Sequence, residues 1–364
     1  MHYLANLYLI NFKNHDFLSL EFSPKVNALV GQNGVGKTNV LDAVHYLSMS
    51  KSYLNPLDRQ NIRLNQGFFS IQGKWVHESE DHTVVCSFKP GTKKIMKRNK
   101  VVYDKMSEHI GLFPVVFISP YDGDLIAEGS EFRRKWLDGI LSQIDRKYLE
   151  DIIQFQRVLE QRNALLKQIA HGAAKREDLL IWNPSFTELG ARIHERRTSF
   201  VEEFSPIFLE NYQEIGAEEE EPTIRYRSDF QKGAFDTLLL QNEQRDLYVQ
   251  HSTVGVQKDE LLFTLNENPV KKFGSQGQQK SFILALRLAQ YHYLHKYSGK
   301  KPVLLLDDIF DKLDRSRVQK IIDLVSKDTF GQVIITDTDQ ARVQALLAPC
   351  VDDFRIFKLP LQEI

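Results

Sequence analysis

A glycine-rich motif close to the N-terminus restricts the fold of this chain more than any other feature. It matches the phosphate-binding pattern G-x-x-x-x-G-K-[ST] without a mismatch. In this pattern, glycines allow backbone N–H groups to turn toward phosphate oxygens, and the following helix adds the positive end of its dipole. The motif consists of Gly31, Gln32, Asn33, Gly34, Val35, Gly36, Lys37 and Thr38. We therefore predict a loop that binds the phosphates of a nucleotide.

The residues on both sides of the loop support this interpretation. An apolar run at 26–30 predicts a buried strand that ends at Gly31, and apolar residues at helical spacing in 40–47 predict a helix after the loop. The alternative, a chance glycine-rich turn, does not require these flanks. In the predicted strand–loop–helix unit, Lys37 reaches the β- and γ-phosphates and the Thr38 hydroxyl ligates Mg²⁺.

A second motif supplies the carboxylates that a metal-dependent phosphate site requires. The apolar run 303–306 predicts a buried strand, and Asp307 and Asp308 follow it directly. We expect Asp307 to hold Mg²⁺ through water and Asp308 to orient or deprotonate the attacking water. The alternative is a strand that ends in solvated acids. The phosphate-binding loop on the same chain favours the metal site.

A third motif, at 274–279, places glycine, serine and glutamine before a helix predicted over 278–297. Small polar residues at a helix N-terminus form an anion site. A second phosphate site on the same chain suggests a nucleotide held between two protomers. Taken alone, the motif would be an ordinary helix N-cap. The residues predicted to bind nucleotide in this motif are Ser275, Gln276, Gly277 and Gln278.

The spacing of apolar residues divides the chain into an α/β head and a helical insert. Strand patterns and the three motifs lie in 1–130 and 246–364, whereas 131–245 has apolar residues at the spacing of long amphipathic helices. An acidic run at 218–221 predicts an exposed loop. We predict a head with a mixed sheet, interrupted by a mostly α-helical lobe. The periodicity is clearest at Trp136, Ile140, Ile144 and Tyr148.

Composition excludes several classes of protein. The chain has 364 residues, of which 42% are hydrophobic and 26% charged, as in ordinary globular proteins and unlike fibrous or disordered chains. Its two cysteines, Cys86 and Cys350, have no metal-ligand spacing, so we expect a reducing, cytoplasmic location without disulfides or zinc. We find no signal peptide in 1–17 and no apolar run long enough to span a membrane.

The net charge of −1 means that a polyanion partner such as DNA has to be bound by a local patch. Clustered cations in 89–105 could bind phosphates, although lysines also protect exposed sheet edges. In a second group, in the helical insert, neighbouring acids favour a solvated helix face. No motif for reading bases is visible. The cations are Lys89, Lys93, Lys94, Lys97, Arg98, Lys100 and Lys105 in the first group and Arg133, Arg134, Arg146, Lys147, Arg157 and Arg162 in the second.

In this order, the three motifs resemble an ABC-type ATPase, and their wide separation along the chain resembles the SMC-like branch. The more specific resemblance is to the RecF family of bacterial recombination-repair ATPases, because SMC proteins carry much longer helical inserts. The residues that carry it are Asn11, Phe12, Lys13 and Asn14; 31–41; Ser119 and Pro120; Gly129, Ser130, Arg133 and Arg134; Leu137 and Asp138; 274–279; and 304–310 with Leu313 and Asp314.

The resemblance implies a slow, DNA-stimulated ATPase that acts as a switch. ATP and Mg²⁺ would hold two subunits together in a homodimer, with Ser275 and Gly277 contacting the γ-phosphate of the nucleotide on the other subunit. The resemblance also implies binding of gapped DNA or single-strand/double-strand junctions. It further implies cooperation with RecR and RecO in loading RecA, in DNA repair, replication restart and the SOS response.

Some single residues also match the family. Asn39 matches the asparagine that follows the threonine of the phosphate-binding loop, and Asp314 matches an aspartate of the loop that crosses the dimer interface. Lys13 and Asn14 fall where SMC-like heads place side chains near the base and phosphates. For these two residues, an ordinary exposed turn is an equal alternative.

The sequence departs from the family pattern in three places. Asp311-Lys312 replaces Ser-Glu, Gln257-Lys258 replaces His-Arg, and Tyr121 replaces a glutamate after Ser119-Pro120. We expect these changes to affect the tuning of hydrolysis and local contacts with DNA or partners. They leave the phosphate-binding loop, the metal-binding acid and the serine of the third motif intact.

Four other functions are compatible with parts of the pattern. A nuclease-coupled ATPase, as in overcoming-lysogeny-defect proteins, needs a further acidic domain, and we expect too little chain after Asp314 for one. A transporter ATPase disagrees with the separated motifs and with aspartate rather than glutamate at Asp308. A dimer that binds ATP without hydrolysing it is opposed only by Asp308. The broadest alternative is an SMC-like ATPase of another DNA-maintenance or anti-phage system.

Overall fold

The computed structural model describes residues 2–215, 220–309, 323, 329–349 and 351–360. The chain divides into two compact units. The first joins Met1–Asp122 to Leu286–Ile364, and the second is the continuous stretch Gly123–Ala285. Among the described residues, no helix has both the length and the apolar character needed to cross a membrane.

The second unit contains the whole predicted insert, 131–245, and extends on to Ala285. The reason is strand pairing, because β9 (Pro222–Arg227) pairs antiparallel with β10 (Glu260–Leu265). This pairing ties the segment that follows 245 to the helices. The third motif, at 274–279, therefore belongs to the second unit, whereas the phosphate-binding loop belongs to the first.

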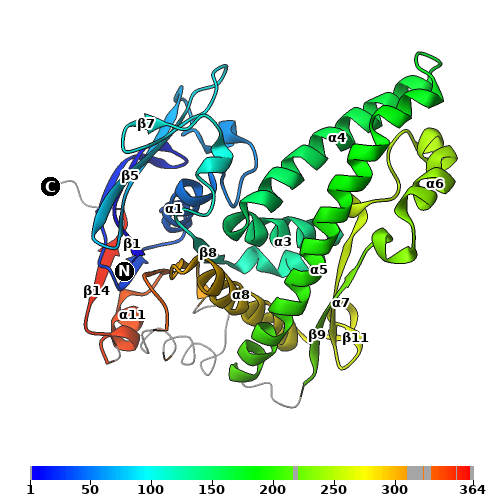
Figure 1. The fold of residues 1–364 in the computed structure, drawn as a ribbon. Coiled ribbons are helices and arrows are strands. Elements are labelled where there is room, and N and C mark those ends of the chain that lie inside the picture. Colours follow the sequence, from blue (N-terminus) through cyan, green and yellow to red (C-terminus); the bar gives the residue numbers. More distant parts are fainter. Residues whose placement is uncertain (1, 216–219, 310–322, 324–328, 350, 361–364) are drawn as a thin grey trace. The chain divides into compact units, whose positions relative to one another are not determined.

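One sheet of the first unit is antiparallel, with the strand order β2-β1-β4-β5-β6-β7. Figure 1 labels β1, β5 and β7 of this sheet. Its strands all lie in 1–130, where the sequence predicts strand patterns. Buried and exposed side chains alternate along much of these strands, as in a sheet with one face in the core. The strands are β1 (His2–Phe12), β2 (His15–Glu21), β4 (Phe69–His77), β5 (Glu80–Phe88), β6 (Ile95–Arg98) and β7 (Val101–Val102).

The other sheet of this unit has the order β14-β3-β13-β12-β8, and all its neighbouring strands are parallel. The predicted strands at 26–30 and 303–306 are confirmed, and every residue in them is buried. Because the strands are parallel, their carboxyl ends meet at one edge of the sheet. The strands are β3 (Val26–Val30), β8 (Val115–Ile118), β12 (Val303–Leu306), β13 (Val333–Asp337) and β14 (Phe354–Lys358).

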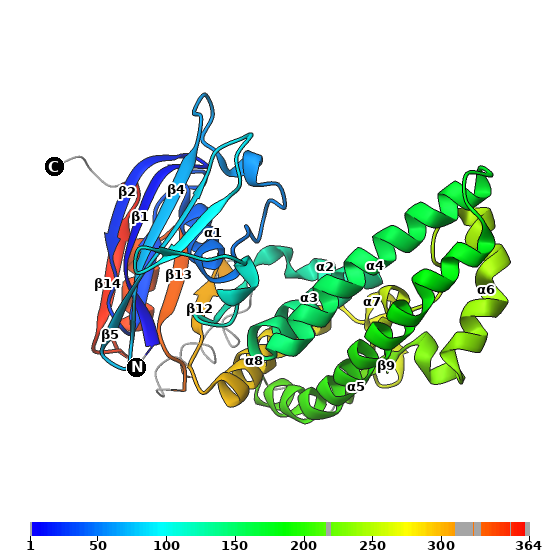
Figure 2. The same ribbon diagram turned by 45° about the horizontal axis from the view of Figure 1, so that its top comes forward.

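Helix α1 (Lys37–Met49) joins the two sheets into one core. Leu41 and Leu47 of this helix are fully buried in the same apolar cluster as Leu7 of β1, Ile71 of β4 and Leu305 of β12. Both ribbon views show α1 against the strands of this unit (Figures 1 and 2). The core therefore holds the helix that begins at Lys37 in a defined position.

The second unit is mainly helical, which confirms the predicted mostly α-helical lobe. Its long helices α4 and α5 lie side by side in both ribbon views (Figures 1 and 2). The unit also contains a small sheet with the strand order β11-β10-β9. The further elements are α2 (Asp124–Ala127), α3 (Ser130–Ile144), α4 (Arg146–Ala170), α5 (Asn183–Glu214), α6 (Phe235–Val249), β11 (Asn268–Pro269) and α7 (Val270–Phe273).

Two details of the predicted elements differ from the structure. The periodic run from Trp136 to Tyr148 is not one helix, because α3 ends at Ile144 and the Asp145 side chain caps the start of α4. Strand patterns are expected from 246 onward, but the first strand after that position is β10, and Tyr248 belongs to the last turn of α6. Helix α8 (Gln276–Ser298) matches the helix expected over 278–297.

The remaining described elements are short or terminal. Helix α11 (Gln340–Leu347) lies between β13 and β14 in the sequence. The 3₁₀ turns are η1 (Asp58–Asn61), η2 (Met106–Glu108), η3 (Pro120–Gly123), η4 (Arg176–Ile181), η5 (Asp229–Lys232) and η6 (Val256–Lys258).

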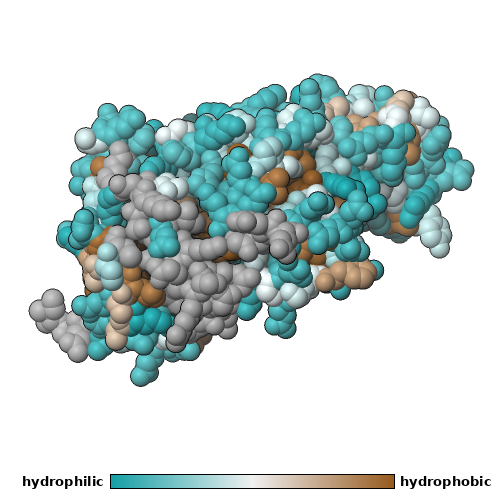
Figure 3. Space-filling model, turned by 90° about the horizontal axis from the view of Figure 1, so that it is seen from below, coloured by the Kyte–Doolittle hydropathy of each residue, from teal (hydrophilic) through white to brown (hydrophobic). Residues whose placement is uncertain are grey.

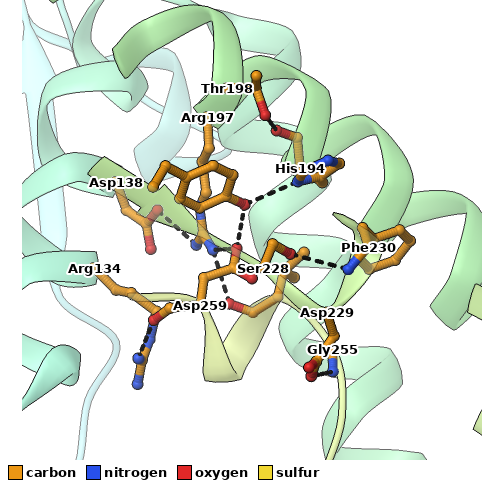
Figure 4. Close-up of polar contacts among 12 residues, drawn as sticks. Arg134, Asp138, His194, Arg197, Thr198, Ser228, Asp229, Phe230, Gly255 and Asp259 are labelled. Carbon is orange, nitrogen blue, oxygen red and sulfur yellow. Dashed lines mark hydrogen bonds and ion pairs between the residues drawn. The ribbon is translucent and has the colours of Figure 1, made fainter. Parts of the chain in front are cut away.

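A buried arginine holds three helices of the second unit to the segment before β10 (Figure 4). Arg197 on α5 is 2% exposed and donates to the carboxylates of Asp138, at 2.9 Å, and Asp259, at 2.6 Å. It also donates to the Tyr148 hydroxyl at 3.0 Å and to the Val256 carbonyl at 2.8 Å. These contacts join α3, α4 and α5 to the 3₁₀ turn η6.

In the face drawn in Figure 3, hydrophilic residues predominate and the hydrophobic ones form small separate patches. Such isolated apolar residues are normal on protein surfaces.

Candidate nucleotide-binding site

The predicted phosphate-binding loop lies between β3 and α1 in the first unit. Gly36 caps α1 with a φ of 101°, in the left-handed region that favours glycine. A Cβ at this position would clash with the side chains of Asn14 and His15. Glycine is therefore required at Gly36 both by backbone conformation and by the close approach of the turn between β1 and β2.

Lys37 points back into the loop that precedes it. Its Nζ donates to the carbonyl oxygens of Gly31 at 2.7 Å and Gln32 at 2.9 Å, and the residue is 8% exposed. The ammonium group is thus held at the centre of the loop by acceptors that belong to the loop itself. A phosphate oxygen bound in the loop could replace these acceptors without a change in the backbone.

Thr38 and Asp307 are joined directly, although 269 positions separate them in the sequence. The Thr38 hydroxyl donates to the Asp307 carboxylate, at 2.9 Å from Oδ1 and 3.0 Å from Oδ2. The connection arises because β13 lies between β3 and β12, so that the residues after β3 and β12 meet at one edge. The structure thus brings together the two predicted metal-binding residues.

A third residue at this edge, Thr336, was not found from the sequence. Its hydroxyl donates to Asp307 Oδ1 at 2.8 Å, and its oxygen accepts the backbone N–H of Asp308 at 2.9 Å. A signal was available, because the apolar run at 333–335 is followed at once by Thr336 and Asp337. Polar residues directly after a buried strand lie at the same edge as those after β3 and β12.

Burial raises the pKa of Asp307 above its usual range, and the hydroxyls of Thr336 and Thr38 only partly offset this. The carboxylate is 3% exposed, so its charge is poorly solvated. Thr38 and Asp307 provide the hard oxygen ligands that Mg²⁺ prefers, usually one or two carboxylates together with phosphate oxygens. These residues therefore fit a magnesium ion bound beside a nucleotide phosphate.

Asp308, the predicted hydrolytic residue, is half-buried beside Asp307. Its φ of 49° lies in the left-handed region, which non-glycine residues rarely adopt. The hydrogen bond from its backbone N–H to Thr336 supports this conformation. Such uncommon backbone conformations often occur at functional sites.

The turn between β1 and β2 covers one side of the phosphate-binding loop. The Asn14 side chain accepts a hydrogen bond from Asn39 at 2.7 Å, and a ring nitrogen of His15 lies 3.1 Å from the Gly36 carbonyl. Lys13 instead forms an ion pair with Asp42 at 2.6 Å, with both side chains buried. Both turn residues thus contact α1, Asn14 through Asn39 in its first turn beside the loop and Lys13 through Asp42 further along the helix.

An open depression lies next to this turn in the first unit. It is formed by the turn, by the end of η1 and by the segment that follows η1. Its lining residues are Lys13, Asn14, Gln60, Ile62, Arg63, Leu64, Asn65 and Gln66.

The third motif lies at the start of α8, in the second unit. The Ser275 Oγ accepts the backbone N–H of Gln278 at 3.2 Å, and the Gln278 side-chain oxygen accepts the backbone N–H of Ser275 at 2.7 Å. This reciprocal pair is a capping box, with glutamine three residues after serine. Gln276 is exposed and Gly277 half-buried, so the first turn of α8 is accessible.

The residues that depart from the family pattern are only partly described. Gln257 is half-buried and its side chain donates to the Val254 carbonyl at 2.7 Å, whereas Lys258 is exposed. Tyr121 is 63% exposed. Asp311, Lys312, Leu313 and Asp314 lie outside the described residues.

Most cations of the helical insert have partners within the second unit. Arg162 is fully buried and bound to Asp246 at 2.8 Å. Arg134 donates to the Asp259 carbonyl at 2.7 Å (Figure 4). Arg133 donates to two backbone carbonyls, and Arg146 and Lys147 each form an ion pair on α4. These contacts favour a structural role for the group over phosphate binding.

The cations of 89–105 lie at one edge of the antiparallel sheet, around β6 and β7. Lys94 is bound to Asp58 at 2.9 Å, and Lys97 and Arg98 are half-buried. The side chains of Lys89, Lys93, Lys100 and Lys105 are exposed. Both the phosphate-binding and the edge-protecting interpretations fit this placement.

Comparison with known proteins gives a consistent result over the whole chain. A family model described as RecF/RecN/SMC N terminal domain matches residues 3–348. The DNA replication and repair protein RecF of Flavobacterium johnsoniae is 47% identical over 358 residues, which are 98% of this chain and 100% of the relative. The protein of the same name from Bacteroides thetaiotaomicron is 43% identical over 359 residues, covering 98% and 96%.

Solved structures show the same similarity. The recombination mediator protein RecF-ATP of the RecFOR pathway matches with a TM-score of 0.87 at 29% identity, covering 93% of each chain. The corresponding RecF-ATPrS structure also has a TM-score of 0.87, at 28% identity, and covers 98% of this chain and 96% of its own. An Smc head domain from Pyrococcus furiosus, at 16% identity and a TM-score of 0.53 over 97% and 93%, shares the fold alone.

Proposed function

Because the chain belongs to the RecF family of RecF/RecN/SMC ATPases, we propose that it is an ATP-dependent, DNA-binding switch in recombinational repair and replication restart. Relatives that cover almost the whole chain are named DNA replication and repair proteins. The observation that carries the proposal is the direct contact between Thr38 and Asp307 beside Lys37. Three residues that a nucleotide–metal complex requires are thereby brought to one edge of a sheet.

In the proposed ATP complex, Lys37 moves from the carbonyls of Gly31 and Gln32 to the β- and γ-phosphates. The backbone N–H groups of Asn33 to Lys37 surround the phosphates, and Asn39 lies at the start of α1 beside them. The depression next to Asn14 would take the nucleoside. A Mg²⁺ ion held by the Thr38 hydroxyl, and by Asp307 through water, would neutralise charge on the phosphate oxygens.

Hydrolysis in this proposal depends on Asp308, which would orient or deprotonate the attacking water. An aspartate side chain reaches less far than a glutamate. We therefore expect slow turnover, as suits a switch whose nucleotide state has to persist. A turnover of hundreds per second would contradict this.

The segment Ser275 to Gln278 supplies the second phosphate contact in the proposal. Its accessible helix start would bind the γ-phosphate on the phosphate-binding loop of a second copy of the chain. ATP would then favour the homodimer because it binds both copies only in the closed state. Hydrolysis would open the dimer and release DNA.

The DNA and protein partners are proposed from the family. We propose gapped or junction DNA as the ligand, with the exposed lysines of 89–105 as candidate contacts to its phosphates. RecR and RecO would act with this protein in loading RecA. The location would be the cytoplasm, where such DNA occurs.

The decisive experiment is the molar mass by light scattering with Mg²⁺ and ATP, ADP or no nucleotide, repeated with gapped DNA. We expect a dimer only with ATP and a further gain in dimer with DNA. A monomer under every condition would contradict the proposed switch. In that case the start of α8 would be only a helix cap.

A further inference from the structure

The start of α8 is held by a contact from outside the third motif. The Gln278 side-chain oxygen is occupied by the Ser275 N–H at 2.7 Å, and its Nε2 donates to Glu220 Oε1, also at 2.7 Å. Glu220 is 58 positions away in the sequence and lies just before β9. The amide of Gln278 is therefore fixed at both ends.

Glu220 is itself held by a buried residue. Its second carboxylate oxygen accepts a hydrogen bond from the Tyr212 hydroxyl. Tyr212, near the end of α5, is fully buried, and its ring packs against Phe208 and Phe282. The packed end of α5 is thus connected to the first turn of α8 through Tyr212, Glu220 and Gln278.

The two ends of the Gln278 amide cannot exchange roles in this arrangement. Only an oxygen can accept from the Ser275 N–H, and only an NH₂ group can donate to the Glu220 carboxylate. Together the two contacts select one orientation of the amide and keep the capping box closed. The closed box occupies the N–H groups of Ser275 and Gln278, whereas the first-turn N–H groups of Gln276 and Gly277 have no partner within the helix.

We infer that Glu220 is a positioning residue for the proposed phosphate contact at Ser275, acting through Gln278. This inference rests on the proposed function, in which Ser275 and the N–H groups after it bind the γ-phosphate on a second copy. By holding the capping box closed, Glu220 keeps the N–H groups of Gln276 and Gly277 and the Ser275 hydroxyl directed toward the position of the γ-phosphate. Without it, the first turn of α8 would have to be ordered when the dimer forms.

The test compares Glu220→Ala with Glu221→Ala in the full-length protein. Glu221 carries the same charge one position further on, and its side chain is exposed, so it is a matched control for charge. We expect Glu220→Ala to raise the protein concentration needed for half-maximal ATP-dependent dimerisation by about tenfold, as for loss of a hydrogen bond to a charged group. Glu221→Ala should leave that concentration unchanged.

A second variant separates positioning from folding. Glu220→Gln keeps the shape of the side chain but can accept only one of the two hydrogen bonds at its oxygen, so its defect should be intermediate. In a Gln278→Ala background, Glu220→Ala should cause no further loss, because Glu220 acts through Gln278. Additive effects of the two changes would contradict the inference.

Hydrogen exchange without nucleotide separates the failure of this inference from the failure of the proposed function. We expect faster exchange of the Ser275 and Gln278 amides in Glu220→Ala than in Glu221→Ala. If the wild-type chain does not dimerise with ATP, the proposed function fails while the exchange result still reports on positioning. Equal exchange in the two variants would overturn the role of Glu220.

Discussion

The Thr38 hydroxyl lies 2.9 Å and 3.0 Å from the two carboxylate oxygens of Asp307, across the carboxyl end of β13. The contact joins the two chain segments of the first unit. Thr38 comes from the N-terminal segment, after β3, and Asp307 comes from the C-terminal segment, after β12. The hydroxyl and the carboxylate are hydrogen-bonded to each other. A metal ion bound at these atoms would compete with this hydrogen bond.

The first prediction concerns the stability of this site. Burial raises the pKa of Asp307, so the folded chain holds this proton to a higher pH than the unfolded chain. Stability therefore falls as the pH rises through the interval between the two pKa values, and the loss persists at neutral pH. We expect Asp307→Asn to stabilise the nucleotide-free protein at neutral pH by about 1 kcal/mol. The side-chain oxygen of Asn can still accept hydrogen bonds from the hydroxyls of Thr38 and Thr336.

Thermal unfolding of the two proteins at several pH values checks this prediction. The gain of Asp307→Asn should shrink as the pH falls and the wild-type carboxyl becomes protonated. The same variant should lose ATP-dependent dimerisation, because Asn lacks the negative charge with which the Asp307 carboxylate holds the metal ion. A variant less stable than the wild type at neutral pH would show that the buried charge is better compensated than we infer.

The second prediction concerns Lys13, for which the sequence left two interpretations. Its buried ion pair with Asp42 means that Lys13→Ala leaves a fully buried carboxylate without its cation. We expect a loss of about 3 kcal/mol in the free energy of unfolding, measured with urea. Arg63→Ala, in the same depression, removes only an exposed ion pair to Asp16 and should cost less than about 1 kcal/mol.

Binding of a non-hydrolysed ATP analogue decides between the two roles of Lys13. If Lys13→Ala weakened binding but left the free energy of unfolding unchanged, the residue would serve the nucleotide rather than the fold.

The third prediction concerns the buried arginine of the second unit. Arg197→Met fills similar space but leaves Asp138 and Asp259 without their shared cation. We expect a loss of about 3–5 kcal/mol in the free energy of unfolding. Arg157→Ala, an exposed arginine on α4, should change it by less than about 0.5 kcal/mol. Equal effects of the two substitutions on denaturation would contradict the structural role of Arg197.

Much of the first unit could be predicted from the sequence because its signals are local. The apolar run 303–306 indicates a buried strand by itself, and the glycines before Lys37 indicate a phosphate-binding loop by themselves. Strand β9 was not predicted, since its pairing with β10 depends on contacts distant in the sequence. The role of Arg197 was hidden for the same reason: Asp138 and Asp259 come from different elements, and sequence spacing does not bring them together.

The fourth prediction concerns DNA. Replacing Lys89, Lys93, Lys100 and Lys105 by glutamine should weaken binding to gapped DNA for every sequence tested. The slope of log K against log salt should fall by about one for each lysine that contacts a phosphate. Glutamine at Arg146, Lys147 and Arg157 is the matched control on α4 and should leave the slope unchanged. An unchanged slope for the lysine variant would assign these residues to protection of the sheet edge.

The fifth prediction tests whether one nucleotide joins two copies of the chain. Lys37→Ala should abolish ATP-dependent dimerisation because the phosphates lose their cation. Ser275→Ala should still bind ATP on its own loop but fail to dimerise, because the second phosphate contact is lost. Each variant alone should therefore remain monomeric in light scattering with Mg²⁺ and ATP.

A mixture of these two variants gives the sharper result. In a mixed dimer, the intact Lys37 of one subunit faces the intact Ser275 of the other, so one of the two nucleotide sites is complete and the other carries both defects. We expect the mixture to recover part of the ATP-dependent dimer that neither variant forms alone. If the mixture stays monomeric while the wild type dimerises, one complete site does not suffice for closure. If Ser275→Ala alone dimerises normally, the nucleotide is not shared between subunits at all.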